Sequence, residues 1–144
     1  MIIREKGQSR LVYCPTDIDR CSWIYGSKDL SDLLQKSVRW MLRGNSPVKV
    51  EGKGNIEIFA WETEAGFALH ILNYTNPNMT RSSIRSYYPV GEQKIMIEIP
   101  EEIKITKIEL LKADKQIPFK QQGNRVEFII PEIVDFEVAA LNKD

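Results

Sequence analysis

The amino-acid sequence predicts a mainly β protein, an antiparallel β-sandwich preceded by one strand–helix (βα) unit. Two patterns along the chain lead to this fold class. Before Pro47, a short apolar run is followed by apolar residues spaced three and four apart, which is the spacing of an amphipathic helix. After Pro47, apolar residues alternate with a period of two in seven or eight segments separated by turn residues. Such a series is typical of an antiparallel sandwich.

The leading part of the chain contains the strand and the helix. Residues 1–8 are polar and are expected to be frayed, whereas the apolar run at residues 10–14 predicts a strand. After a loop, an apolar stripe predicts a helix at residues 28–43, with Gly44 as its stop. One strand and one helix cannot bury both of their apolar faces, so we expect this α/β domain to be incomplete.

The segment Asn45-Ser46-Pro47 is the predicted boundary between a domain at residues 1–46 and a sandwich at residues 47–144. It follows a helix stop, contains a proline and precedes the change from helical to strand-like periodicity. The expected β segments are a first strand, a hairpin and five later strands, at residues 48–51, 56–76, 93–99, 104–111, 116–120, 124–130 and 134–141. Because Pro118 cannot donate a backbone hydrogen bond, its strand is expected to lie at a sheet edge. This number and spacing of strands predicts a sandwich of the immunoglobulin-like kind.

The hairpin at residues 56–76 is the most apolar part of the predicted sandwich. Its first arm places Ile58 on one row and Phe59 and Trp61 on the other, and Gly66 closes its turn. The second arm is apolar on both rows. We therefore expect it to lie deep in a sheet with cover on each side.

Composition excludes several classes of partner. Twenty basic residues balance twenty acidic ones, so no net charge attracts nucleic acid or an anionic membrane. No apolar stretch reaches the length of a membrane span, and the N-terminal residues do not have the pattern of a signal peptide. We therefore expect a cytoplasmic protein that binds neither nucleic acid nor membrane, in which the sequons at Asn73 and Asn78 are accidental.

Few residues in the leading part could carry chemistry. Cys14 and Cys21 lack the spacing and the histidine neighbours that zinc requires, so free thiols are expected, and no metal or other cofactor is predicted. Asp17 and Asp19 could hold a divalent cation or act as an acid–base pair. An ion pair with Arg20, or capping of the loop, is favoured because a cation needs further ligands.

Aromatic side chains are the candidates for binding a sugar, since an aromatic ring offers apolar area to the C–H face of a pyranose. Trp61 lies on the more polar row of the hairpin and is the better tryptophan for this role, although a packing role is favoured for it. Trp40 lies on the helix and is expected to be buried. Tyr87 and Tyr88 form an adjacent pair in a long polar loop. His70, the only histidine, lies in mid-strand and is expected to be structural.

One set of residues resembles a known family. It comprises the run from the expected strand into the loop, positions in and around the helix, and the end of the hairpin: RLVYCPTDIDR at 10–20, Trp23, Gly26, Asp29-Leu30, Ser37-Val38-Arg39-Trp40 and Asn73-Tyr74-Thr75-Asn76-Pro77. This pattern resembles the end of the β-galactosidase trimerisation-type domain of certain glycoside hydrolase-like proteins. The resemblance implies that the chain covers the last βα unit of an amidotransferase-like, flavodoxin-like α/β domain and the C-terminal β-sandwich after it.

In such proteins, as the resemblance implies, an upstream (β/α)₈ barrel carries the chemistry. True class I glutamine amidotransferases have a histidine general base at the place where this chain has Cys14-Pro15-Thr16-Asp17. Without that histidine, and without a nucleophile elbow, the α/β part is expected to be catalytically empty.

The function expected from this resemblance is that of a non-catalytic C-terminal accessory or assembly region of a β-galactosidase-like protein. Its partner would be the upstream barrel or a second copy of the chain, and its loop and interface residues would be Asp17, Asp19, Arg20 and Trp23. The alternative is a sandwich that itself binds carbohydrate, through the exposed aromatic residues Trp61, Tyr87 and Tyr88.

Overall fold

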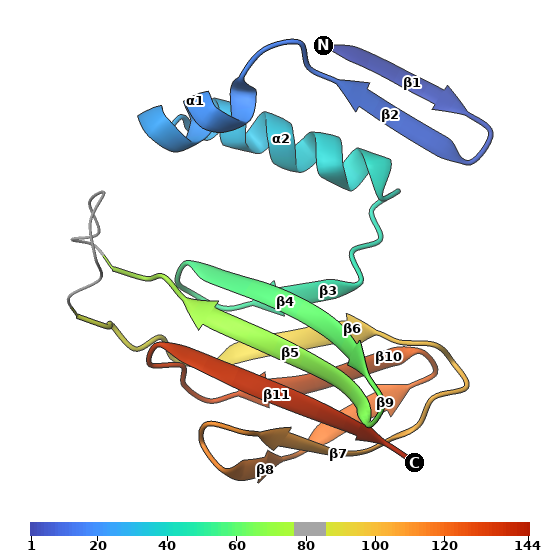
Figure 1. The fold of residues 1–144 in the computed structure, drawn as a ribbon, viewed down its shortest axis with the longest axis vertical. Helices are drawn as coiled ribbons and strands as arrows, with labels where there is room; N and C mark the ends of the chain where they lie inside the picture. The colour runs from blue at the N-terminus through green and yellow to red at the C-terminus, as the bar shows by residue number, and fades with distance from the viewer. Residues whose placement is uncertain (77–85) are drawn as a thin grey trace. The chain divides into compact units, whose positions relative to one another are not determined.

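A computed structural model describes residues 1–76 and 86–144 of the chain (Figure 1). The chain forms two compact units, Met1–Ser46 and Pro47–Asp144. Within the described residues the paired strands are antiparallel and the helices number two. The predicted fold class, mainly β with an antiparallel sandwich, is thereby confirmed. None of the helices in the described residues is long and apolar enough to cross a membrane.

The leading unit contains a hairpin and two helices, β1 (Ile2–Lys6), β2 (Ser9–Tyr13), α1 (Ile18–Tyr25) and α2 (Lys28–Met41). The expectation of a single strand after a frayed terminus was wrong, because β1 pairs with β2 over five residue pairs. Gly7, with φ of 58°, supplies the left-handed conformation that the tight turn between them requires. The expected loop after the strand is also wrong in part, since it contains α1, which ends at Gly26 with φ of 59°.

Helix α2, which was predicted two residues longer at its end, is held to the hairpin through Arg10. The Arg10 guanidinium donates a hydrogen bond of 2.7 Å to the carbonyl of Trp40 and lies 4.7 Å from the centroid of its indole ring. Trp40 is consequently half-buried rather than buried as expected. Glu5 accepts hydrogen bonds from Arg10 at 3.1 Å and from Arg43 at 3.0 Å, so one carboxylate joins the hairpin to the end of the helix.

The leading unit has apolar faces but no fully buried residue. On one face of the hairpin, Ile2 is 51% exposed, Leu11 55% and Tyr13 54%. On α1, Trp23 is 81% exposed and Tyr25 78%. A unit of this size with no core gains little of the apolar burial that stabilises a domain by itself.

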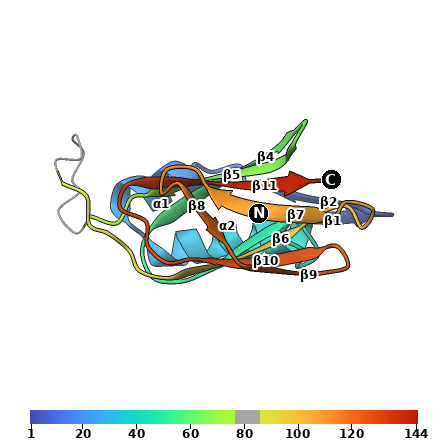
Figure 2. The same ribbon diagram turned by 90° about the horizontal axis from the view of Figure 1, so that it is seen from below.

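The second unit is a sandwich of two sheets, seen edge-on as two layers in Figure 2. One sheet has the order β3-β6-β10-β9, with bounds Val48–Glu51, Gln93–Glu98, Arg125–Ile130 and Phe119–Gln122. The other has the order β4-β5-β11-β7-β8, with bounds Ile56–Thr63, Gly66–Asn73, Phe136–Lys143, Ile105–Leu110 and Lys115–Ile117. The inward rows of both sheets form one core, whose members with 0% exposure are Leu69, Ile71, Ile95, Ile108, Val126, Ile130 and Ala139. Each large aliphatic among them contributes about 1.5–3 kcal/mol relative to an exposed position.

Pro118 divides the strand that was expected at residues 116–120. The residues before it form β8 and those after it begin β9, and these two strands belong to different sheets. Proline has no N–H to donate to a ladder, so the chain can leave one sheet and enter the other at this position without losing a hydrogen bond.

Strand β5 lies between β4 and β11, as expected for the most apolar arm of the hairpin. The expectation of cover on both sides was wrong within this unit. Its inward residues Leu69 and Ile71 have 0% exposure, but on its outward row Ala68 and Leu72 are half-buried and His70 is exposed. Within the described part of the sandwich, the outward side chains of β5 are flanked by those of β4 and β11.

Candidate ligand-binding face

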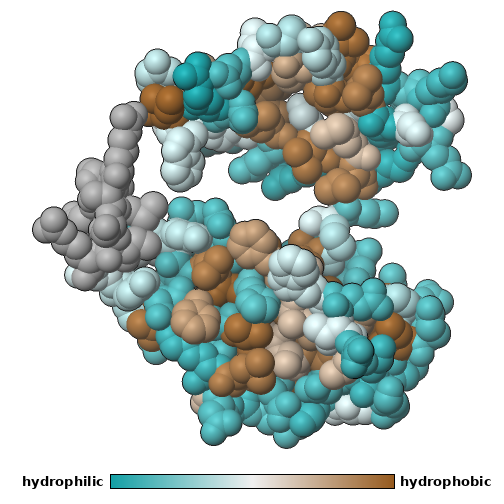
Figure 3. Space-filling model, in the orientation of Figure 1, coloured by the Kyte–Doolittle hydropathy of each residue, from teal (hydrophilic) through white to brown (hydrophobic). Residues whose placement is uncertain are grey.

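The outward side chains of β4, β5, β11 and β7 form a surface that we call the aromatic face: Phe59, Trp61, Ala68, His70, Glu109, Phe136, Val138 and Ala140. Figure 3 shows apolar side chains gathered over the sheet surface that β4, β5 and β11 turn to the viewer in Figure 1. Trp61 is 60% exposed and Phe59 is 45% exposed, although both lie in regular strand. Large rings exposed together on one sheet face mark a candidate binding surface.

The strand register places seven of these side chains in two neighbouring rows, and Phe136 lies in a third row, opposite Leu72. In the first row, Phe59 lies opposite His70, and His70 lies opposite Val138. In the second row, Trp61 is followed across the sheet by three residues in turn, Ala68, Ala140 and Glu109. Two alanines therefore form a low floor between a tall indole ring on β4 and a carboxylate on β7.

Polar groups border this floor on the side away from Trp61. One Glu109 carboxylate oxygen accepts a hydrogen bond of 3.0 Å from Lys107 Nζ, and the other accepts one of 3.2 Å from Asn142 Nδ2. Asn142 lies opposite Lys107 on the adjacent strand. The charges of Lys107 and Glu109 offset each other, so this border presents donors and acceptors without a net charge.

The outward face of the other sheet has a different chemistry. Glu127 pairs with Lys94 at 3.4 Å and with Arg125 at 2.7 Å, and charged side chains continue along that face. A cavity of about 390 Å³ opens there beside Phe119 and Ile129. The two outward faces are thus distinct, one rich in rings and one rich in ion pairs.

Asn73, at the end of β5, joins three segments of the sandwich. It is 5% exposed, and its Nδ2 group donates to the carbonyls of Tyr88 at 2.8 Å, Ile133 at 3.1 Å and Val134 at 2.8 Å. Its Oδ1 accepts from the Thr75 amide at 2.9 Å. A glycan on this sequon would break these bonds, so the role of Asn73 is structural. The second sequon residue, Asn78, lies outside the described residues.

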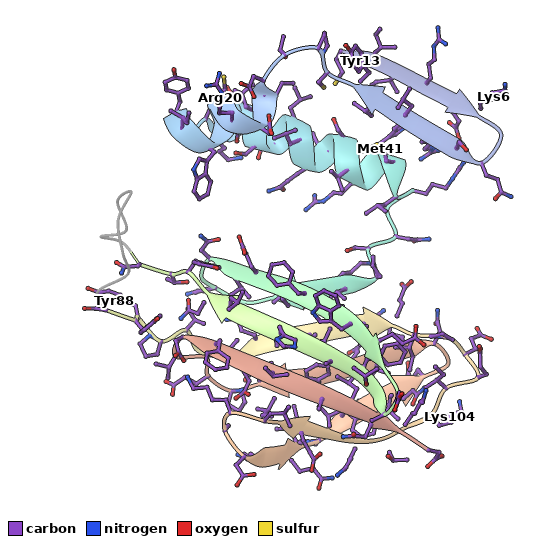
Figure 4. The ribbon with its side chains drawn as sticks, viewed as in Figure 1. Lys6, Tyr13, Arg20, Met41, Tyr88 and Lys104 are labelled. Carbon is purple, nitrogen blue, oxygen red and sulfur yellow. The ribbon has the colours of Figure 1, made fainter. Side chains whose placement is uncertain are left out.

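The structure separates the aromatic residues that were predicted to bind sugar. Tyr87 is 52% exposed and Tyr88 is 40% exposed. Tyr88 is hydrogen-bonded to Asn73, which pairs with Ile56 at the beginning of β4 and so marks one end of the sandwich. Trp61 is five residues farther along β4, or about 17 Å at the usual rise of a strand. Figure 4 labels Tyr88 at one end of the sandwich and Lys104 at the other. Trp61 and the tyrosine pair therefore do not form one site.

The candidate residues of the leading unit lie on or beside α1. Asp17 precedes the helix and forms the expected ion pair with Arg20, and Trp23 projects from the helix with 81% exposure. Asp19 is exposed in the first turn. Cys14 and Cys21 are half-buried free thiols, the second of them on α1. Within residues 1–76 and 86–144, no three carboxylate, cysteine or histidine side chains come together as a metal site.

The sequence singled out Trp61 as a candidate for binding sugar, but not the residues that lie beside it in the sheet. Ala68, Ala140 and Glu109 come from three different strands, and only the register brings them beside the indole ring. The one local signal was Phe59, which shares the outward row of β4 with Trp61.

Comparison with solved structures shows which fold this is. The chain is similar to the α-L-fucosidase isoenzyme 2 from Paenibacillus thiaminolyticus, with a TM-score of 0.77 and 18% sequence identity. The two share a fold. The similarity covers 99% of this chain and 22% of the fucosidase, so this chain spans about a fifth of that protein's length. No protein-family profile matches the chain, and no curated sequence matches it.

Proposed function

We propose that the chain is a non-catalytic accessory region of a glycoside hydrolase-like, carbohydrate-active protein, which it helps to assemble. The observation that carries this proposal is the likeness of 99% of the chain to a minor part of an α-L-fucosidase chain. The likeness extends over both units, which is expected if the two units occur together as an appendage to a larger enzyme.

The exposed apolar faces of the leading unit support an assembly role. The hairpin face of Ile2, Leu11 and Tyr13 and the rings of α1 are uncovered within the unit. Burying ~500 Å² of such surface would contribute on the order of 12 kcal/mol before the costs of association. The upstream catalytic barrel is the proposed partner, and a second copy of the chain would take its place when the barrel is absent.

The distribution of reactive groups supports a role without chemistry. A Cys–His pair needs both groups within hydrogen-bond reach. Both cysteines lie in the leading unit, whereas His70, the only histidine, lies on β5 of the sandwich. Neither unit therefore holds a cysteine and a histidine together.

Two sugars are candidates for the substrate of the larger protein. The resemblance of residues 10–40 to the β-galactosidase trimerisation-type domain favours a β-galactoside, and the name of the structural neighbour favours an α-L-fucoside. Aryl glycosides of both sugars distinguish these substrates in one assay.

The test is to read the genomic frame upstream of Met1 and to express its continuous product beside the 144-residue chain. We expect the longer product to hydrolyse one of the two aryl glycosides and to lose solubility or assembly when residues 1–144 are removed. We expect the chain alone to hydrolyse neither glycoside nor glutamine. Hydrolysis by the chain alone that disappears in Cys14→Ser would overturn the proposal, and so would a frame that stops just before Met1.

A further inference from the structure

We propose that the aromatic face binds a neutral sugar ring, stacked against Trp61, lying over the Ala68–Ala140 floor and hydrogen-bonded by Glu109 and Asn142. The accessory role proposed above is not needed for this site, because its groups all belong to the sandwich. The site assigns a ligand class to a surface whose residues come from four strands.

The first step in the argument is the exposure of the Trp61 indole ring. Trp61 is 60% exposed although it lies within the regular strand β4, and its direct neighbour across the sheet is the small side chain of Ala68. Phe136, by contrast, has Lys112 Nζ 4.4 Å from its ring centroid. Trp61 thus offers the larger apolar surface for stacking, and the C–H face of a pyranose is a matching surface.

The second step is the floor. Ala68 and Ala140 are paired neighbours on β5 and β11, and the next strand brings Glu109. Trp61 and Glu109 lie three strands apart in the same row. With strands about 4.8 Å apart, their backbones are therefore about 14 Å apart, and the side chains between them are the methyl groups of two alanines. This spacing accommodates a small ring and its hydroxyl groups between the indole and the carboxylate.

The third step is the polar border. Each oxygen of Glu109 holds one hydrogen bond, from Lys107 or Asn142, and a carboxylate oxygen can accept a second. The Asn142 amide can both donate and accept. Hydroxyl groups need this mixture of donors and acceptors, and the balanced charges of Lys107 and Glu109 favour a neutral ligand over an anion.

The same features disfavour a protein partner on this face. The cores of protein interfaces are depleted of charged residues, whereas here Glu109 and Lys107 directly adjoin the floor. The Trp61 indole beside two alanines also suits a small ligand, such as one sugar ring, better than a broad complementary surface.

The experiment is an NMR titration of the full, isotope-labelled chain with methyl β-D-galactopyranoside, methyl α-L-fucopyranoside and methyl β-D-xylopyranoside. Free D-galacturonate serves as the charged counterpart. We expect saturable shifts of the Trp61 indole N–H and of the Ala68 and Ala140 amides with at least one neutral sugar. We expect D-galacturonate to bind no more tightly than the neutral galactoside.

Three variants locate the site. Trp61→Ala removes the stacking surface, and Ala68→Leu fills the floor while leaving the ring, so each should weaken binding by about tenfold or more. Trp23→Ala is the matched control, because it removes an exposed tryptophan from the other unit and should leave the affinity unchanged. Thermal midpoints of all three show that the sandwich is folded.

Three results would overturn the proposal. They are the absence of saturable shifts with all three neutral sugars, binding that survives both Trp61→Ala and Ala68→Leu, and binding of D-galacturonate alone. If instead light scattering found self-association that Trp61→Ala abolished, without any sugar response, the face would be a protein contact.

Discussion

The buried amide of Asn73 should be among the most sensitive polar positions of the sandwich. In Asn73→Ala the carbonyls of Tyr88, Ile133 and Val134 lose a donor, and the Thr75 amide loses its acceptor. A buried polar group left unsatisfied costs about 1–3 kcal/mol. The total should stay below the sum of four such costs, because Ile133 O keeps its 3.0 Å hydrogen bond from the Val90 amide and Tyr88 is 40% exposed.

We therefore expect Asn73→Ala to lower the free energy of unfolding by about 2–4 kcal/mol. For a domain of this size, that corresponds to a fall of about 10–25 °C in the thermal midpoint, measured by calorimetry or circular dichroism on the full chain. Asn55→Ala is the matched control, since Asn55 is exposed and bonds Thr75 through its backbone amide, which the substitution keeps. A fall of less than about 4 °C for Asn73→Ala, equivalent to 1 kcal/mol or less, would refute the structural role of the amide.

Three further predictions concern the two units. A chain of residues 46–144 should unfold in one cooperative thermal transition, because the buried core lies in the sandwich, and a non-cooperative melt would show that the leading unit is needed. The hydrogen bond from Arg10 holds the pKa of the Glu5 carboxyl below its usual value, so its stabilising effect is present at neutral pH and is lost as the pH falls through that lowered pKa. Glu5→Gln should therefore speed amide exchange of the hairpin at pH 7 but not at pH 2, and an equal effect at both would contradict the ion pair. The full chain, expressed without an upstream part, should self-associate through residues 10–43. Val38→Glu should therefore lower the average mass of the particles measured by light scattering. A monomeric wild-type chain would contradict this prediction.

The strands of the sandwich could be predicted from sequence because one row of each must enter a shared core. Burial of one row leaves an alternation of apolar residues in the local sequence. This alternation located the hairpin and the strand before Pro100 closely. The helix was predicted for the same reason, since its apolar stripe covers β2.

The elements that were missed show no such pattern of apolar residues in their own sequence. Strand β1 has an exposed residue at every position, so no alternation marks it, and only Gly7 indicated a turn. Helix α1 has no buried residue and its stripe is correspondingly weak. The neighbours of Trp61 were beyond prediction because pairing between distant strands depends on register, which depends on the packing of the whole sandwich.

The side chains of Asn73 and Asn76, at the end of the hairpin, have a consequence for where this chain can change in length. Besides the Asn73 bonds, Asn76 Nδ2 donates to the carbonyl of Ser86 at 2.9 Å, so the described residues before 77 and after 85 are hydrogen-bonded to each other. Once the ends are held, doubling the length of a loop costs only about 0.6 kcal/mol. Because the two flanks are held together by these bonds, a change in the number of residues between Asn76 and Ser86 should cost the sandwich little folding free energy.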